Sequence, residues 1–105
     1  MNNNRTVIIT GSSGFIGSRL VAHFSRLGFQ VRAFQRTVPV KGSPGVIYYP
    51  FNLVDVQDHG FAGADFLIHC AYRPFISKRD RDSGTNVDFE GTKKVLSLAR
   101  KHGIK

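Results

Sequence analysis

Apolar residues recur along the chain in short runs, and the segments between those runs carry a helical period. The first run, Val7-Ile8-Ile9, leads into a glycine-rich segment, and similar runs follow around Val31, Ile47 and Leu67. Continuous apolar runs of this length, bounded by turn residues, are typical of strands that are buried on both faces of a parallel sheet. The predicted strands span residues 5–10, 29–34, 46–51 and 65–70.

Two longer segments carry helical spacing. The first is predicted at about residues 14–27, and its apolar positions are expected to share one face: Ile16, Leu20, Phe24 and Leu27. The second is predicted over residues 87–102, with Val95, Leu96 and Ala99 as its apolar stripe. Gly28 and Gly103 are placed to end the two helices.

The remaining segments complete the predicted order of elements. Residues 36–44 contain two prolines and a glycine and are predicted to form a loop. Residues 54–61 are expected to hold one or two helical turns, and Ile104-Lys105 to begin a fifth strand.

Strands that alternate with helices predict an α/β fold with parallel strands and right-handed crossovers. The doubly wound arrangement places the strands in the order 3-2-1-4, with a crevice between the first and the fourth. We find no internal repeat or linker, so residues 1–105 are interpreted as one incomplete domain without a second one, the first part of a longer enzyme. The unpaired fourth strand is expected to favour self-association or pairing with a further strand.

The segment Thr10-Gly11-Ser12-Ser13-Gly14-Phe15-Ile16-Gly17 joins the first strand to the first helix. Gly11 can turn the chain sharply, Gly14 leaves room for a diphosphate beside the backbone, and Gly17 lets the helix pack closely. The start of the helix presents unpaired amide hydrogens that suit an anion. The alternative is a glycine-rich turn without a ligand.

This spacing, Gly-x-x-Gly-x-x-Gly with Phe-Ile after the second glycine, resembles the extended short-chain dehydrogenase/reductase family, including its epimerases, dehydratases and dihydroflavonol-reductase-like members. The resemblance covers nearly the whole chain and implies the N-terminal part of a Rossmann-type dinucleotide-binding domain. Carried over position by position, it implies the following cofactor-binding residues: Gly11, Ser13, Gly14, Phe15, Ile16, Gly17, Arg36, Asn52, Leu53, Cys70 and Ala71.

The end of the second strand bears on the choice of cofactor. An acidic residue that binds the adenosine ribose is usual there, but this chain has Gln35 and Arg36. A guanidinium can pair with a 2′-phosphate through parallel hydrogen bonds. The run Val-Arg-Ala-x-x-Arg at residues 31–36 also looks like that of NADPH-using members of the family, which implies NADP rather than NAD. The alternative for Arg36 is a solvated surface arginine.

The ends of the third and fourth strands carry the other implied contacts. Asn52-Leu53 stands where the family commonly has Asp-Leu, and Asn52 could meet the adenine or simply begin a turn. His69-Cys70-Ala71 resembles the family's His-x-Ala-Ala segment, although Tyr72 replaces the second small residue. We interpret His69 as a hydrogen-bonded interior histidine and Cys70 as a small buried side chain rather than a nucleophile.

The last helix begins with a segment that looks like the family's Asn-Val-x-Gly-Thr, but two extra residues precede Gly91. The asparagine role therefore stays open between Asn86 and Asp88.

The family's catalytic pair, Tyr-x-x-x-Lys, is missing from this sequence. Its three tyrosines are followed four positions later by Asn52, Leu53 and Ile76, and no metal-ligand spacing occurs. The chain by itself is expected to bind at most part of a cofactor and to catalyse nothing, so whether the protein is an enzyme is left open. The alternative is a non-catalytic sensor or scaffold of the same fold.

Composition adds three further expectations. Hydrophobic residues make up 41% of the chain and charged residues 21%, a globular balance. A single cysteine and the lack of a signal-peptide pattern or a long apolar stretch suggest a cytoplasmic protein away from the membrane. The net charge of +8 could indicate nucleic acid, but the basic residues are scattered, so an anionic cofactor is the preferred partner.

Overall fold

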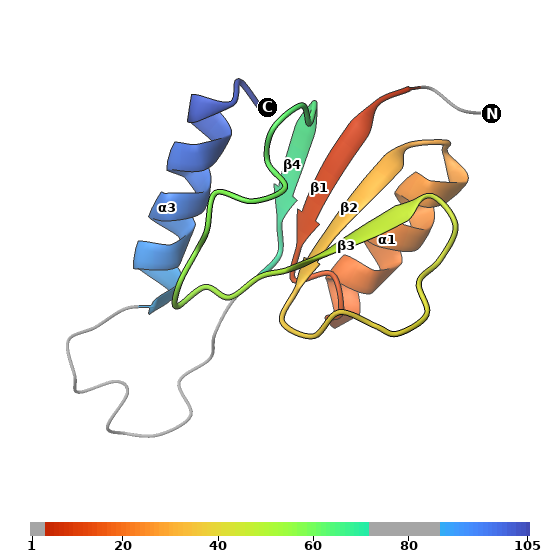
Figure 1. Ribbon diagram of the computed structural model, residues 1–105, viewed down its shortest axis with the longest axis horizontal. Helices are drawn as coiled ribbons and strands as arrows, with labels where there is room; N and C mark the ends of the chain where they lie inside the picture. Colours follow the sequence, from red (N-terminus) through yellow and green to blue (C-terminus); the bar gives the residue numbers. More distant parts are fainter. Residues whose placement is uncertain (1–3, 72–86) are drawn as a thin grey trace.

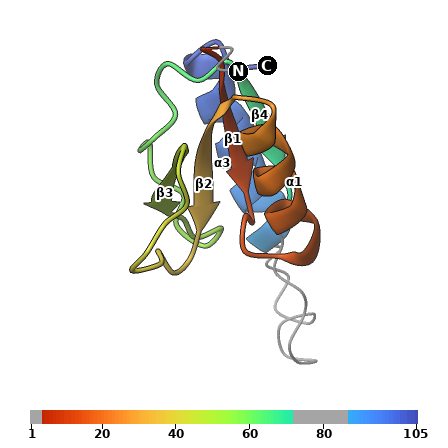
Figure 2. The same cartoon turned by 90° about the vertical axis from the view of Figure 1, so that its right-hand side faces the viewer.

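The computed structural model describes residues 4–71 and 87–105. Four parallel strands form one sheet in the order β3-β2-β1-β4, which confirms the predicted α/β fold and strand order. Helix α1 covers one face of this sheet and helix α3 the other (Figures 1 and 2). The elements are β1 (Thr6–Thr10), α1 (Phe15–Arg26), β2 (Gln30–Gln35), β3 (Val46–Pro50), β4 (Phe66–His69) and α3 (Val87–Lys101).

The register brings the carboxyl ends of all four strands to one edge of the sheet. Thr10 lies between Phe34 of β2 and His69 of β4, and Pro50 lies opposite Gln35. In open parallel sheets this edge is where ligands bind. The fold therefore gathers at one edge the segments that follow β1, β2, β3 and β4.

Strand β1 lies at the centre and is buried along its whole length, as its apolar run predicts. Its side chains alternate between two cores. Val7 and Ile9 pack with Val31 on the α1 side, whereas Ile8 packs with Phe34 and the core beneath α3.

Both described helices end in the way their glycines predict. Gly28 has φ of 86°, and the amides of Gly28 and Phe29 donate to the carbonyls of Ser25 and Phe24. Gly103 has φ of 68° and follows the same pattern at the end of α3. These bonds form Schellman motifs, in which a left-handed glycine reverses the chain. Each helix therefore ends just before its glycine, and the chain then turns back toward the sheet.

The predicted apolar face of α1 is partly wrong. Leu20 and Phe24 pack onto the sheet, but Ile16 is 63% exposed and Leu27 is 50% exposed. The side of α1 that faces the sheet also contains Gly17 and Val21, which precede Leu20 and Phe24 by three positions each. Ile16 lies in the first turn of α1 and Leu27 at its C-cap, so both exposed residues lie at the ends of the helix.

The expected helical turns at residues 54–61 are not present. This segment forms turns and bends, although Val56 and Phe61 are buried beneath α3. Gly60 and Gly63 adopt φ of 85° and 80°, which a right-handed helix excludes. Side-chain anchoring replaces helical hydrogen bonds here, as described below.

The outer edge of β4 forms two hydrogen bonds with Lys105. The amide of Lys105 donates to the carbonyl of Asp65, and the amide of Leu67 donates to the carbonyl of Lys105. Bonds to residues on either side of Phe66 are the parallel pattern. This finding agrees with the expectation that Ile104-Lys105 begins a fifth strand.

Candidate functional site

The glycine loop turns directly against the end of β4. Gly11 has φ of +66°, and a Cβ on it would lie 2.7 Å from the amide nitrogen of Ala71 and 2.9 Å from the carbonyl carbon of Cys70. Any other residue at this position would be strained by its backbone conformation and would collide with backbone. The structure therefore brings Gly11, Cys70 and Ala71 together, as the sequence-based site requires.

Gly17 is needed for a close approach between α1 and the loop. Gly17 is buried, and a Cβ on it would overlap the carbonyl oxygen of Gly11 and lie 3.0 Å from the Cα of Ser12. The prediction was that Gly17 lets the helix pack closely on the sheet. The close contact is instead with the loop backbone, so Gly17 fixes the shape of the loop itself.

The start of α1 is left open for an anion. Its N-cap is Gly14, which has no side chain to cap the helix, and the first turn contains no acidic residue. The first amides of a helix have no partner within the helix and carry a partial positive charge. Beside Gly14 itself, a Cβ would approach only the carbonyl oxygen of Gly11, at 3.3 Å. These features fit a diphosphate group beside the backbone.

Ser13, Phe15 and Ile16 surround this helix start and are all exposed. The guanidinium of Arg19 lies 3.7 Å from the centre of the Phe15 ring and donates to the carbonyl oxygen of Phe15 at 2.8 Å. Arg19 thus fixes Phe15, the first residue of α1, through both its ring and its carbonyl group.

A buried hydroxyl group joins the end of β1 to the end of β4. Thr10 Oγ1 accepts hydrogen bonds from the amides of Cys70 at 3.0 Å and Ala71 at 3.1 Å, and it lies 2.6 Å from His69 Nδ1. Two amide donors use both lone pairs of the hydroxyl oxygen, so its own hydrogen must point to His69 Nδ1. The segment proposed to line the cofactor is therefore fixed by Thr10.

The same bonds determine the state of His69. Because Nδ1 accepts from Thr10, the proton of the neutral ring lies on Nε2, which is 2.9 Å from the hydroxyl oxygen of Thr92 on α3. His69 is half-buried. This arrangement agrees with the interpretation of His69 as a hydrogen-bonded interior histidine that links β1, β4 and α3.

Cys70 is a free, half-buried cysteine beside the glycine loop. Burial raises the pKa of the Cys70 thiol. The thiolate is the nucleophilic form, so a raised pKa disfavours nucleophilic chemistry at neutral pH. Cys70 is best described as a small side chain that keeps this wall of the site compact.

The end of β2 is tied to the glycine loop by side chains. Ser12 Oγ donates to Gln35 Oε1 at 2.7 Å, and Gln35 Nε2 donates to the carbonyl oxygen of Thr37 at 2.8 Å. Arg36 lies between these anchored residues and is exposed. No described residue forms a hydrogen bond or an ion pair with its guanidinium, so Arg36 is available to an anionic ligand at this edge.

Asn52 and Leu53 follow β3 at the same edge of the sheet. Asn52 Oδ1 accepts from the amide of Val54 at 3.0 Å, so this side chain does begin a turn, and its amide nitrogen is available as a donor to a ligand. Leu53 is buried, and a Cβ on Gly91 of α3 would lie 2.6 Å from its carbonyl oxygen and from Cδ2. Gly91 therefore lets α3 approach the loop after β3.

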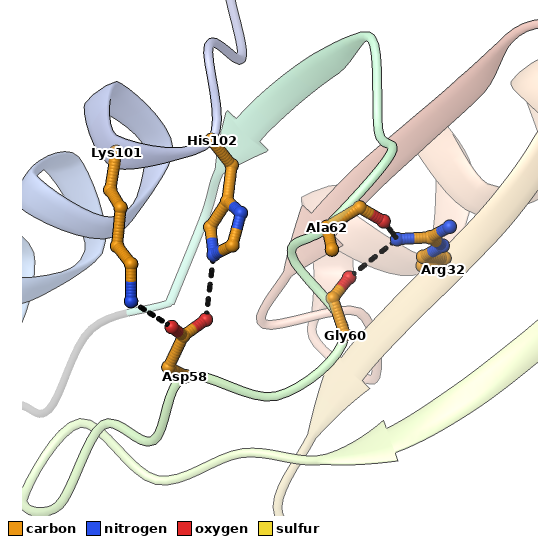
Figure 3. Close-up of polar contacts among 6 residues, drawn as sticks. All are labelled: Arg32, Asp58, Gly60, Ala62, Lys101 and His102. Atoms are coloured by element: carbon orange, nitrogen blue, oxygen red, sulfur yellow. Dashed lines mark hydrogen bonds and ion pairs between the residues drawn. The ribbon is translucent and has the colours of Figure 1, made fainter.

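Two anchors hold the non-helical segment 58–62 in place (Figure 3). Asp58 pairs with Lys101 at 2.7 Å and with His102 at 2.8 Å, and these contacts lower the pKa of the Asp58 carboxyl, with the Lys101 hydrogen bond as the largest cause. Arg32 donates to the carbonyl oxygens of Gly60 and Ala62 at 2.8 and 2.6 Å. These contacts are structural and lie away from the glycine loop.

Sequence reasoning missed the two hydroxyl groups that hold the site together. Thr10 and Ser12 are buried, at 0% and 4% exposure, although both residues are polar. A hydroxyl at the end of an otherwise apolar strand was the available signal, because a buried polar group needs a partner. Tyr72 and the open choice between Asn86 and Asp88 concern side chains outside those the structure describes.

Residues 4–71 and 87–105 contain neither a candidate metal centre nor a candidate membrane-spanning helix. No group of three or more His, Cys, Asp or Glu side chains is placed to hold a metal ion in this part of the chain. None of its helices is long and apolar enough to cross a membrane.

Comparison with known proteins gives consistent results. The model of the NAD dependent epimerase/dehydratase family matches residues 7–105. A Synechocystis sp. protein that carries a provisional dihydroflavonol 4-reductase name is 29% identical over 100 residues, which are 91% of this chain and 29% of that protein. The 2-alkyl-3-oxoalkanoate reductase of Stenotrophomonas maltophilia is 32% identical over 101 residues, covering 93% of this chain and 30% of the reductase.

Solved structures agree with these relatives. A short-chain dehydrogenase/reductase superfamily protein from Agrobacterium tumefaciens, crystallised with bound NAD, superposes with a TM-score of 0.80 at 26% identity. The match covers 96% of this chain and 30% of that protein. The chain thus spans less than a third of the length of these relatives.

Proposed function

Because the chain belongs to the NAD dependent epimerase/dehydratase family, we propose that it is the cofactor-binding N-terminal part of a reductase, epimerase or dehydratase that uses NADP(H). The observation that supports this proposal most strongly is the glycine loop: Gly11 and Gly17 shape its backbone, and Gly14 leaves the start of α1 without a side-chain cap. A dinucleotide supplies hydride chemistry when it is bound. The residues of this chain would bind and orient it.

Three groups of residues would hold the dinucleotide. The backbone amides of Ser13, Phe15, Ile16 and Gly17 would bind the diphosphate, because a helix start favours anions. The Gly14 amide already donates to the carbonyl oxygen of Gly11 at 3.1 Å. Cys70 and Ala71 would form the wall beside it, held by Thr10. Asn52 and Leu53 would border the adenine, with the amide nitrogen of Asn52 as a donor.

The preference for NADPH over NADH rests on charge at the end of β2. Gln35 occupies the usual acidic position, so no carboxylate there repels a 2′-phosphate. Arg36 is exposed and can form charge-assisted hydrogen bonds with that phosphate. Binding of NAD remains compatible with the rest of the site, since the other contacts do not involve the 2′ position.

We place no catalytic residue in this chain. Tyr48 and Tyr49 lie in the edge strand β3, and the Tyr49 ring packs against Phe34 and His59. These contacts support a structural role for Tyr49. The third tyrosine, Tyr72, lies outside the described residues. The acid/base group of the complete enzyme is therefore proposed to come from elsewhere.

Calorimetric titration with NADPH and NADH tests the proposal. The chain should bind NADPH more tightly than NADH, and Gly14→Val should abolish binding because its side chain would occupy the space of the diphosphate. A control substitution, Leu96→Val on the outer side of α3, should bind as the parent does. Leu96 was predicted in the apolar stripe of this helix, but it is 57% exposed, whereas Val95 and Ala99 are buried. Unchanged binding by Gly14→Val would show that the loop is not the diphosphate site.

A further inference from the structure

We propose that Ser12 is a positioning residue for cofactor selection, acting through Gln35 on the group that meets the adenosine ribose. This inference rests on the proposed function, because it concerns the same cofactor site. Ser12 belongs to the glycine loop, whereas Gln35 ends β2, and the two residues are joined by a 2.7 Å hydrogen bond. The loop that would hold the diphosphate is thus directly coupled to the residue beside the 2′ position.

The orientation of the Gln35 amide follows from its partners. The carbonyl oxygen of Thr37 can only accept, so the Gln35 atom 2.8 Å away must be the nitrogen. The oxygen of the amide therefore faces Ser12, and the serine hydroxyl must donate to it. Ser12 is only 4% exposed, so its hydroxyl has little access to water as an alternative partner.

This orientation favours a ligand that accepts hydrogen bonds. Gln35 Oε1 already accepts from Ser12, whereas the second hydrogen of Nε2 has no acceptor among the described residues. A ribose diol needs an acceptor, which a carboxylate supplies in NAD-binding sites. A 2′-phosphate offers acceptors only. With Ser12 in place, Gln35 is presented as a donor and suits the phosphate.

The same bonds also fix the segment that carries Arg36. The carbonyl oxygen of Gln35 accepts from the amide of Phe51 at 2.9 Å, which holds the backbone before Arg36. The bond from Gln35 Nε2 to the carbonyl of Thr37 holds the backbone after it. Arg36 is therefore exposed on a segment anchored on both sides, which reduces the conformational entropy lost when it binds an anion.

The test measures the ratio of the dissociation constants for NADH and NADPH in three single variants. Ser12→Ala removes the hydroxyl. Gln35→Leu removes the side-chain hydrogen bonds of Gln35 to Ser12 and to Thr37 and keeps a side chain of similar size. Ser97→Ala, the same deletion at an exposed position of α3, is the control. Circular dichroism checks folding, and Gln35→Leu alone carries the test if Ser12→Ala does not fold.

We expect Ser12→Ala to lower the preference for NADPH about three- to tenfold, the equivalent of one lost hydrogen bond, while binding of NADH changes less than about twofold. Gln35→Leu should lower the preference at least as much, and adding Ser12→Ala to it should change nothing further. Ser97→Ala should match the parent.

A parent-like ratio in Ser12→Ala would overturn the inference alone; if both cofactors were weakened equally, that ratio would indicate damage to the loop only. A further shift on adding Ser12→Ala to Gln35→Leu would also overturn it, because Ser12 would then act by another route. A parent chain that binds neither dinucleotide would overturn the proposed function itself.

Discussion

Thr10→Val is the substitution that best probes how the site is held together. Valine has nearly the shape of threonine, so the change removes the hydroxyl from a residue with 0% exposure and leaves its volume in place. The amide of Ala71 loses the oxygen to which it donates, and Nδ1 of His69 loses the hydroxyl that donates to it. Cys70 keeps a partner, because its amide also donates to the carbonyl oxygen of Thr10 at 3.2 Å.

Two half-buried groups, the amide of Ala71 and Nδ1 of His69, therefore lose the hydrogen bond that Thr10 supplies. Each such loss costs about 1–1.5 kcal/mol, so we expect Thr10→Val to lower the free energy of unfolding by about 2–3 kcal/mol. For a domain of this size, that change corresponds to a fall in Tm of about 8–20 °C. The effect is large because native domains have a stability of only about 5–15 kcal/mol.

Urea denaturation followed by circular dichroism gives the required free energies. Thr10→Ser keeps the hydroxyl and should cost about 1 kcal/mol for the lost methyl group. Thr6→Val is the matched control on the same strand, because Thr6 Oγ1 donates only to Gln30, in a 3.2 Å bond. The expected order of cost is Thr10→Val first, with Thr10→Ser and Thr6→Val well below it. If Thr10→Val were no more costly than Thr10→Ser, the hydroxyl would not hold β4 against the loop.

Two further predictions concern charged residues. Arg36→Ala should weaken binding of NADPH about 10- to 100-fold with little effect on NADH, because a charge-assisted contact is lost, and Arg36→Lys should restore part of it; equal losses for both cofactors in calorimetry would remove the proposed role. Lys101 and His102 lower the pKa of the Asp58 carboxyl in the folded state. The contribution of these contacts to the free energy of unfolding should therefore be complete above the unfolded pKa of about 3.9, and it should be lost as the pH falls through the folded pKa. Asp58→Asn should therefore flatten the acid side of the stability profile, mainly at low salt, and an unchanged acid limb would contradict this reading.

Much of the fold could be predicted because its signals are local. The buried run at Val7-Ile8-Ile9 identifies the central strand, and Gly28 and Gly103 mark where helices end. Parallel strands joined by helices then leave few possible topologies. The order β3-β2-β1-β4 follows from these features together with the glycine loop between β1 and α1.

The errors arose where tertiary contacts override local pattern. The spacing of Ile16 and Leu27 fits the apolar face of a helix, but both residues lie at its ends and are exposed, whereas Leu20 and Phe24 pack onto the sheet. Residues 54–61 have no helix because distant partners hold them, with Asp58 bound to the end of α3. No periodicity within the segment encodes those contacts.

The candidate site likewise has a part that the sequence predicts and a part that depends on tertiary contacts. The glycines were recognisable because their spacing has a steric reason that Gly11 and Gly17 now illustrate. The connections from Thr10 to the end of β4 and from Ser12 to Gln35 depend on strand register, so a sequence alone does not reveal them. The structure thus adds the side chains that position the loop to the residues that the sequence had placed in it.

The central claim is that the glycine loop and the first turn of α1 receive a dinucleotide diphosphate. The most direct measurement is a titration of the ¹⁵N-labelled chain with NADPH, followed through the backbone amide resonances. We predict the largest shifts at the amides of residues 13–17, with smaller shifts at Cys70 and Ala71 and none along the outer side of α3. Saturable binding that leaves the amides of residues 13–17 unshifted, or no binding at all, would contradict the claim.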